Sequence, residues 1–143
     1  MKNSEKVPES RISYLIGIII NFFVLYAVNK APEWNIVFLT EEYVDVRQIL
    51  AAAILVQLAG SVILIILRTA VMHYLLHVIF NFVTVYALYR LIVVFPFDFA
   101  SLGAPAVGTI LKILLSISLI ATIIGLISNM YKLKYTLKKD RRG

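Results

Sequence analysis

Residues 49–67 read ILAAAILVQLAGSVILIIL and contain no charged side chain. Because an α-helix needs about 20 mostly apolar residues to cross the hydrocarbon core of a bilayer, this stretch predicts a membrane-spanning helix. The whole chain has the same character, since 61% of its 143 residues are hydrophobic and 15% are charged, against about 45–50% and about 25% in soluble domains. The composition therefore predicts an integral membrane protein and leaves no room for a separate soluble domain.

Charged residues and helix breakers divide the apolar sequence into four spans. Thr40 is a suitable N-cap for the second span, Pro96 closes the third, and Pro105 fits the first turn of the fourth. We predict an all-α membrane protein, a single four-transmembrane-helix bundle over residues 12–130, between a short N-terminal segment (1–11) and a basic tail (131–143). The expected spans cover about 12–29, 41–67, 70–95 and 105–130.

The Lys and Arg residues are divided unevenly between the two sides of this bundle. Four spans place both termini on one side, which carries ten of the 14 Lys and Arg residues, while the other side carries four. Since Lys and Arg are enriched in cytoplasmic loops, we expect both termini on the cytoplasmic side of a cell membrane, the cytoplasmic or inner membrane.

Six of those ten basic residues lie in the tail, directly beside the membrane. Each is expected to be attracted to anionic lipid headgroups by about 1 kcal/mol, and no motif in the tail indicates nucleic-acid binding. The bilayer is therefore the expected partner of this segment. The residues are Lys132, Lys134, Lys138, Lys139, Arg141 and Arg142.

Polar residues recur at helical spacing inside the spans, as in the series His73, His77, Asn81 and Thr84. Residues three or four apart share one face of a helix, and in lipid such polar faces mark where helices meet. Counted at about 1.5 Å per residue, one polar residue of each span falls near the bilayer midplane, with the two histidines closer to the cytoplasm. We predict one polar cluster inside a compact bundle, formed by His73, His77, Asn81, Gln57, Asn21 and Ser118.

This cluster has two interpretations. It either joins the helices through hydrogen bonds, or forms a binding site in which His73 and His77 change charge between about pH 5 and 8. The two histidines could also face one metal ion or a haem. Zinc sites, however, use three or four protein ligands, and the chain has no cysteine and no further histidine. We therefore predict no metal and no cofactor.

Three charged residues are expected at the interface on the outer side. The first outer connection, 29–47, is acidic and aromatic and should lie on the membrane, while the second, around residues 95–99, should dip into the interface. Arg90 either pairs with Asp98 or with an acid of the first connection, or extends its charged head to the interface, as Lys112 is expected to do.

The sequence contains no pattern typical of an enzyme. A serine nucleophile would need a histidine and an acid within reach, yet the acids all lie toward the outer side or in the terminal segments, and no glycine-rich phosphate loop is present. We predict a non-enzymatic accessory, assembly or interaction subunit, as a homo-oligomer or with a membrane partner. The alternatives are a small oligomeric transporter or channel that uses the polar cluster, and a holin-like membrane permeabiliser.

Overall fold

The computed structural model describes residues 10–143 and contains four long helices. All four are long and apolar enough to cross a membrane. The expected N-terminal segment 1–11, with Lys2 and Lys6, lies outside the described residues except for its last two positions. The elements are α1 (Arg11–Lys30), a short 3-10 helix η1 (Ala31–Trp34), α2 (Tyr43–Ile66), α3 (Ala70–Val94) and α4 (Pro105–Arg142).

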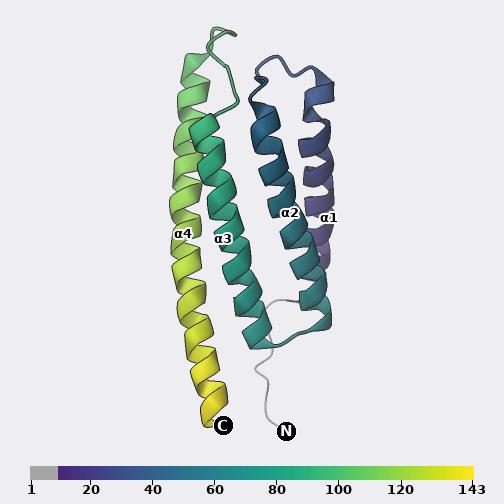
Figure 1. Cartoon of the computed structure of the whole chain (residues 1–143), viewed down its shortest axis with the longest axis vertical. Helices are drawn as coiled ribbons and strands as arrows, with labels where there is room; N and C mark the ends of the chain where they lie inside the picture. The colour runs from purple at the N-terminus through teal and green to yellow at the C-terminus, as the bar shows by residue number, and fades with distance from the viewer. Residues whose placement is uncertain (1–9) are drawn as a thin grey trace.

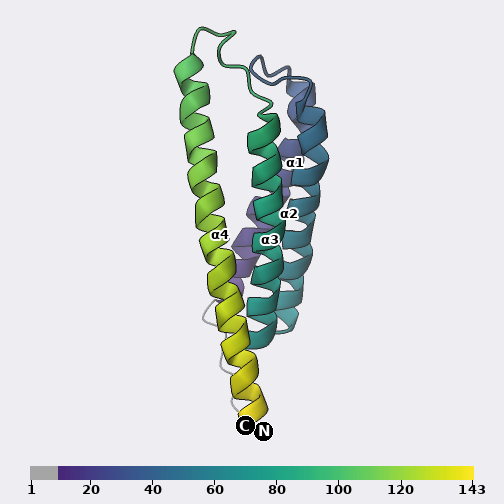
Figure 2. The same ribbon diagram turned by 60° about the vertical axis from the view of Figure 1, so that its left-hand side comes forward.

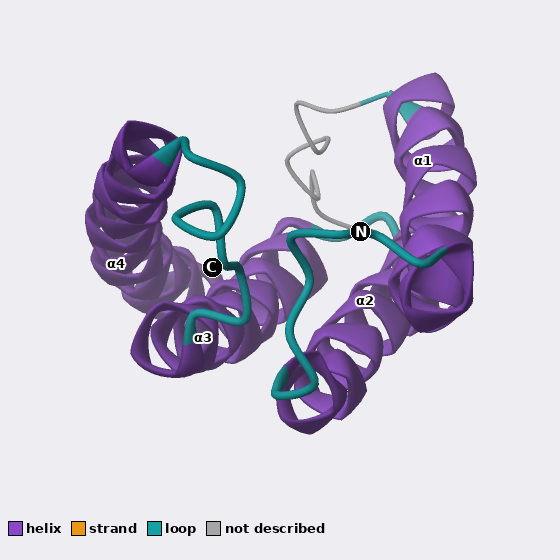
Figure 3. Cartoon of the chain, turned by 90° about the horizontal axis from the view of Figure 1, so that it is seen from above, coloured by secondary structure: helices purple, strands orange, loops and turns teal. Residues whose placement is uncertain are grey.

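The helices run up and down side by side in chain order (Figures 1 and 2). Helix α1 packs on α2, α2 on α3, and α3 on α4, because short connections make consecutive helices antiparallel neighbours. Viewed from above, they form an open arc with α1 and α4 at its two ends (Figure 3). The bundle is thus less compact than expected, since within residues 10–143 α1 and α4 form no interface comparable to the other three.

Helix α4 is much longer than its neighbours. Its 38 residues correspond to about 57 Å, whereas the 25 residues of α3 correspond to about 38 Å at 1.5 Å per residue. Consequently α4 continues past the level at which α3 begins (Figure 1). The basic tail expected at 131–143 is therefore not a separate segment but the last turns of a continuous helix.

Side-chain caps begin two of the helices. The hydroxyls of Ser10 and Thr69 accept hydrogen bonds from the backbone N–H groups of Ser13 and Met72, each at 3.3 Å, as N-caps do. Thr40 is not the N-cap of α2 that its sequence context predicts, since Glu42 holds that position. Thr40 instead belongs to a contact between the two outer connections, in which its N–H donates to the Pro96 carbonyl at 3.0 Å.

The core lies near the end at which α2 turns into α3. Tyr14, Leu64 and Leu76 are buried there, one from each of the first three helices. Gly60 lets α2 approach α3 closely, since a Cβ at this position would overlap the Phe80 ring. None of the residues of α4 is buried, so the core is built from three helices and α4 is attached to it through α3.

Candidate functional site

The two histidines lie together at the core, as their spacing predicts for one helix face. His73 is only 6% exposed, and its Nδ1 lies 2.8 Å from the Tyr14 hydroxyl oxygen. The His77 ring lies beside it, tilted by 45° with the ring centroids 4.3 Å apart, and makes an edge-to-face contact with the Phe80 ring. Tyr14, His73 and His77 thus form one continuous group.

Tyr14 is absent from the cluster predicted from the sequence. It occupies the position after Ser13, in a segment where an aromatic residue adds to the apolar character of the span. Its hydroxyl nevertheless makes the hydrogen bond that joins α1 to α3, two helices that are not consecutive in the arc. A buried tyrosine hydroxyl normally has a hydrogen-bond partner, so a tyrosine among apolar residues is the signal that could have identified it.

Gln57 also forms a hydrogen bond between helices, but not with the group of Tyr14, His73 and His77. Its Nε2 donates to the Thr84 hydroxyl at 3.0 Å and joins α2 to α3. Thr84 is the last member of the polar series on α3, at the three- or four-residue spacing of its predecessors. The hydrogen bond is partly buried, as expected for a polar pair between two membrane-spanning helices.

Asn81 is directed toward α4. Its Nδ2 lies 3.4 Å from the position that a Cβ at Gly125 would occupy, so the amide packs against the surface that this glycine leaves open. The polar residues of α3 therefore contact three different helices, with His73 against α1, Thr84 against α2 and Asn81 against α4.

Asn21 and Ser118 do not join these groups. Within residues 10–143, neither residue forms a hydrogen bond with the other four members of the predicted cluster. Asn21 is half-buried on α1, and Ser118 is exposed on α4, where its hydroxyl donates to the Leu114 carbonyl at 2.9 Å. Thr122 donates in the same way to the Ser118 carbonyl at 2.7 Å. These hydroxyls are satisfied inside α4 and need no partner from another helix.

The two outer connections are joined to each other. Leu39 and Phe97 form an antiparallel bridge, with hydrogen bonds from Thr40 N–H to the Pro96 carbonyl (3.0 Å) and from Asp98 N–H to the Phe38 carbonyl (2.8 Å). We call residues 38–40 and 96–98 the loop clasp. The clasp depends on two segments meeting in space, so neither local sequence contains a signal for it.

The predicted interfacial charges have separate environments. Lys112 Nζ lies 4.5 Å from the centre of the Phe95 ring, a cation–π distance, rather than extending freely. Asp98 accepts a hydrogen bond from the Ser101 N–H at 3.1 Å and forms no salt bridge with Arg90. In the described part of the chain, Arg90 Nε is buried without a hydrogen-bond partner. The pairing of Arg90 with Asp98, one of the alternatives, is therefore not formed.

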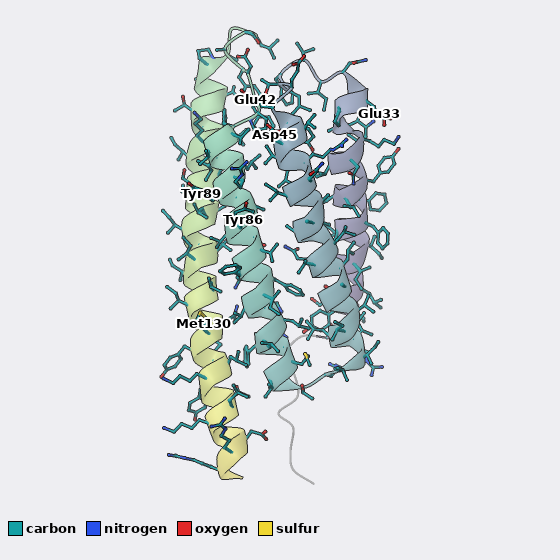
Figure 4. All side chains as sticks on the ribbon, in the orientation of Figure 1. Glu33, Glu42, Asp45, Tyr86, Tyr89 and Met130 are labelled. Atoms are coloured by element: carbon teal, nitrogen blue, oxygen red, sulfur yellow. The ribbon has the colours of Figure 1, made fainter. Side chains whose placement is uncertain are left out.

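The basic residues expected in the tail lie on the exposed surface of the last turns of α4 (Figure 4). At the opposite end of the molecule, Lys30 and Glu33 form an ion pair at 2.8 Å, which the sequence analysis did not predict.

Over residues 10–143 no group of three or more His, Cys, Asp or Glu side chains is placed to hold a metal ion. Comparison of the chain with protein-family models, with curated proteins and with solved structures found no match.

Proposed function

We propose that the chain is a non-enzymatic membrane subunit whose polar residues hold its own helices together and whose outer helices bind a membrane partner. The hydrogen bonds of α3 support the first part. Tyr14–His73 and Gln57–Thr84 each join α3 to a different helix, and Asn81 faces Gly125 on α4. Such bonds between membrane helices contribute about 0.6 kcal/mol each on average, which suits a packing role.

The open arc is the observation that supports an interaction role. Within residues 10–143, the only helix on which α4 packs extensively is α3, and α4 has no buried residue over its whole length. In α1 only Tyr14 is buried. Each end of the arc therefore presents a helix whose remaining surface is available to another membrane helix. A second copy of the chain or a different membrane protein would each bury this surface.

Cysteine scanning of α4 tests this role, because the chain contains no cysteine of its own. Single cysteines are placed at successive positions from 113 to 127 and oxidised or cross-linked in native membranes. We expect adducts to recur every three or four positions, marking one face of α4, with a control series of cysteines on α2 giving none at buried positions such as Leu58. A complete absence of adducts along α4 would contradict the proposal.

The proposed placement is a cell membrane with both termini in the cytoplasm. The support is the excess of Lys and Arg on the side of the termini, ten residues against four. The start of α1, the α2–α3 turn and the end of α4 all lie at one end of the molecule (Figure 1), so a single orientation accounts for the whole excess.

Transport is the second candidate, favoured by the group of Tyr14, His73 and His77. Histidine changes charge in the physiological pH range, and neighbouring histidines inside a membrane are found in proton relays. Purified protein in liposomes with an imposed gradient between pH 5 and pH 8 tests it. Proton, ion or organic-cation flux that is lost in His73→Ala would support transport, and no flux in the wild type would exclude it under these conditions.

A further inference from the structure

An open recess lies between the first turns of α3 and the last turns of α4. Its volume is about 500 Å³, within the range of about 300–1,000 Å³ typical of small-molecule sites. Its apolar part is formed by Val78 of α3 and by Met130, Leu133 and Leu137 of α4. Met130, labelled in Figure 4, and Leu137 are 54% and 43% exposed, so the described residues 10–143 leave this apolar surface uncovered.

Three cations line the same recess, namely Lys134, Lys138 and Arg141. Their spacing of four and three residues places them on one face of α4. Among residues 10–143, no acidic residue lines the recess, and none of the three cations forms a salt bridge with an acid of that part of the chain. The described lining of the recess thus combines an apolar part with three basic side chains.

The position of the recess relative to the membrane indicates which kind of ligand can fill it. The apolar span expected to end at residue 130 leaves the hydrocarbon core where Met130 lies, and the three cations follow in the next turns. A ligand that fills the recess must therefore present an apolar part toward the membrane and an anionic group beyond it. Anionic phospholipids have this chemistry, and basic pockets beside membrane helices recognise such headgroups.

We propose that this recess binds one anionic phospholipid, with its phosphate held by Lys134, Lys138 and Arg141 and an acyl chain against Val78, Met130 and Leu133. The site requires α4 to lie in a membrane but is independent of any protein partner. It also divides the six basic residues of the last turns into two groups. Three of them line the recess, while Lys132, Lys139 and Arg142 do not.

That division supplies a matched pair of variants. The recess variant is K134Q/K138Q/R141Q, and the control variant is K132Q/K139Q/R142Q; each removes three positive charges from the same turns of α4. A third variant, Val78→Phe, fills the apolar part and leaves every charge in place. The full-length protein is purified in detergent, its helix content is checked by circular dichroism, and bound lipids are counted by native mass spectrometry.

The probes are phosphatidylglycerol, phosphatidylcholine and glycerol 3-phosphate. We expect the wild type and the control variant each to bind one phosphatidylglycerol, at about tenfold lower lipid concentration than they bind phosphatidylcholine. The reason is that basic side chains attract anionic headgroups. The recess variant should lose this preference, and Val78→Phe should bind phosphatidylglycerol more weakly than wild type does. Equal loss in both triple variants would show a diffuse surface attraction, and unchanged binding in Val78→Phe would remove the recess as the site.

Glycerol 3-phosphate separates a lipid from a soluble phosphate compound. If it displaces phosphatidylglycerol at comparable concentration, the acyl chain contributes nothing and the lipid assignment is wrong. If either altered protein loses helix content, the comparison of phosphatidylglycerol with phosphatidylcholine on the wild type still decides the proposal, because equal binding of the two lipids overturns it. Failure of cross-linking along α4 would leave this result untouched, so the lipid site and the subunit role are tested separately.

Discussion

The Tyr14 hydroxyl lies 2.8 Å from His73 Nδ1 and joins α1 directly to α3 across 59 positions of sequence. The other helix contacts follow chain order, so this bond links two helices that are otherwise held together through α2. Both residues are 6% exposed and lie at the apolar core beside Leu64 and Leu76. The geometry makes this pair a polar contact inside the three-helix core.

Replacing Tyr14 with Phe should lower stability while keeping the ring in the core. The substitution removes the hydroxyl and leaves His73 without this partner, and we expect a loss of about 1 kcal/mol, within the range measured for hydrogen bonds between membrane helices. Unfolding in mixed detergent, followed by circular dichroism, measures the change. Tyr26→Phe is the control, because Tyr26 is 60% exposed, and an equal effect of the two substitutions would contradict the assignment.

Gly60→Ala tests the close approach of α2 and α3. The added methyl group would meet the Phe80 ring, and overpacking of this kind destabilises by about 1–3 kcal/mol. Gly17→Ala is the matched control, since nothing lies within 4 Å of a Cβ there and alanine favours the helix by about 1 kcal/mol. We expect opposite signs for the two, and Phe80→Leu should recover part of the Gly60→Ala loss.

The helices themselves follow from the sequence, since apolar runs bounded by Pro96, Pro105 and Arg68 fix where each can lie. Helical spacing also predicts that His73 and His77 share one face, which their ring distance of 4.3 Å confirms. Both are local properties. They depend on composition and on the 3.6-residue period of a helix, and both can be counted along the chain.

What the sequence could not provide is which faces meet. One polar face per helix predicts a compact bundle with a shared cluster, but the polar series on α3 turns around the helix enough for Thr84 to meet α2 and Asn81 to meet α4. Ser118 is satisfied by its own helix, an option that a serine always has in a helix. The packing partner of a polar residue thus depends on the helix arrangement, which spacing does not encode.

A double-mutant cycle on Gln57 and Thr84 should detect their hydrogen bond. Gln57→Leu and Thr84→Val each remove one partner, and the coupling energy should be about 0.6 kcal/mol, with about 1.7 kcal/mol as the upper limit seen for such pairs. Gln57→Leu combined with Thr122→Val is the control cycle, because Thr122 bonds within α4. A coupling as large in the control as in the Gln57–Thr84 cycle would mean that the variants act through general loss of packing.

The proposed orientation predicts opposite labelling at the two ends of α4. A single cysteine at Ser101 should react with a membrane-impermeant thiol reagent in intact cells, because Ser101 lies in the outer connection, whereas one at Arg142 should react only after permeabilisation. Both positions are exposed, so burial does not limit either reaction. The reverse pattern would invert the topology, and labelling of both from outside would rule out a membrane-spanning α4.

The loop clasp predicts a disulfide between Leu39→Cys and Phe97→Cys. Two backbone hydrogen bonds flank this pair, from Thr40 to Pro96 and from Asp98 to Phe38, so Leu39 and Phe97 form the non-hydrogen-bonded type of antiparallel pair. In such pairs the Cα atoms lie about 4.5 Å apart, at the short end of the range of about 4.4–6.8 Å that a disulfide spans. Mild oxidation should therefore close the bond with little movement of the backbone.

A protease site inserted at the α2–α3 turn makes the bond visible, because it separates the two cysteines into different fragments. After cleavage, the fragments of the oxidised protein should migrate together until a reductant is added. The control pair is Leu39→Cys with Ser101→Cys, which lies four residues beyond the bridge in a turn closed by Asp98. If the control pair forms a disulfide as readily as the bridge pair, the two connections move freely past each other. The loop clasp would then not hold the two connections together.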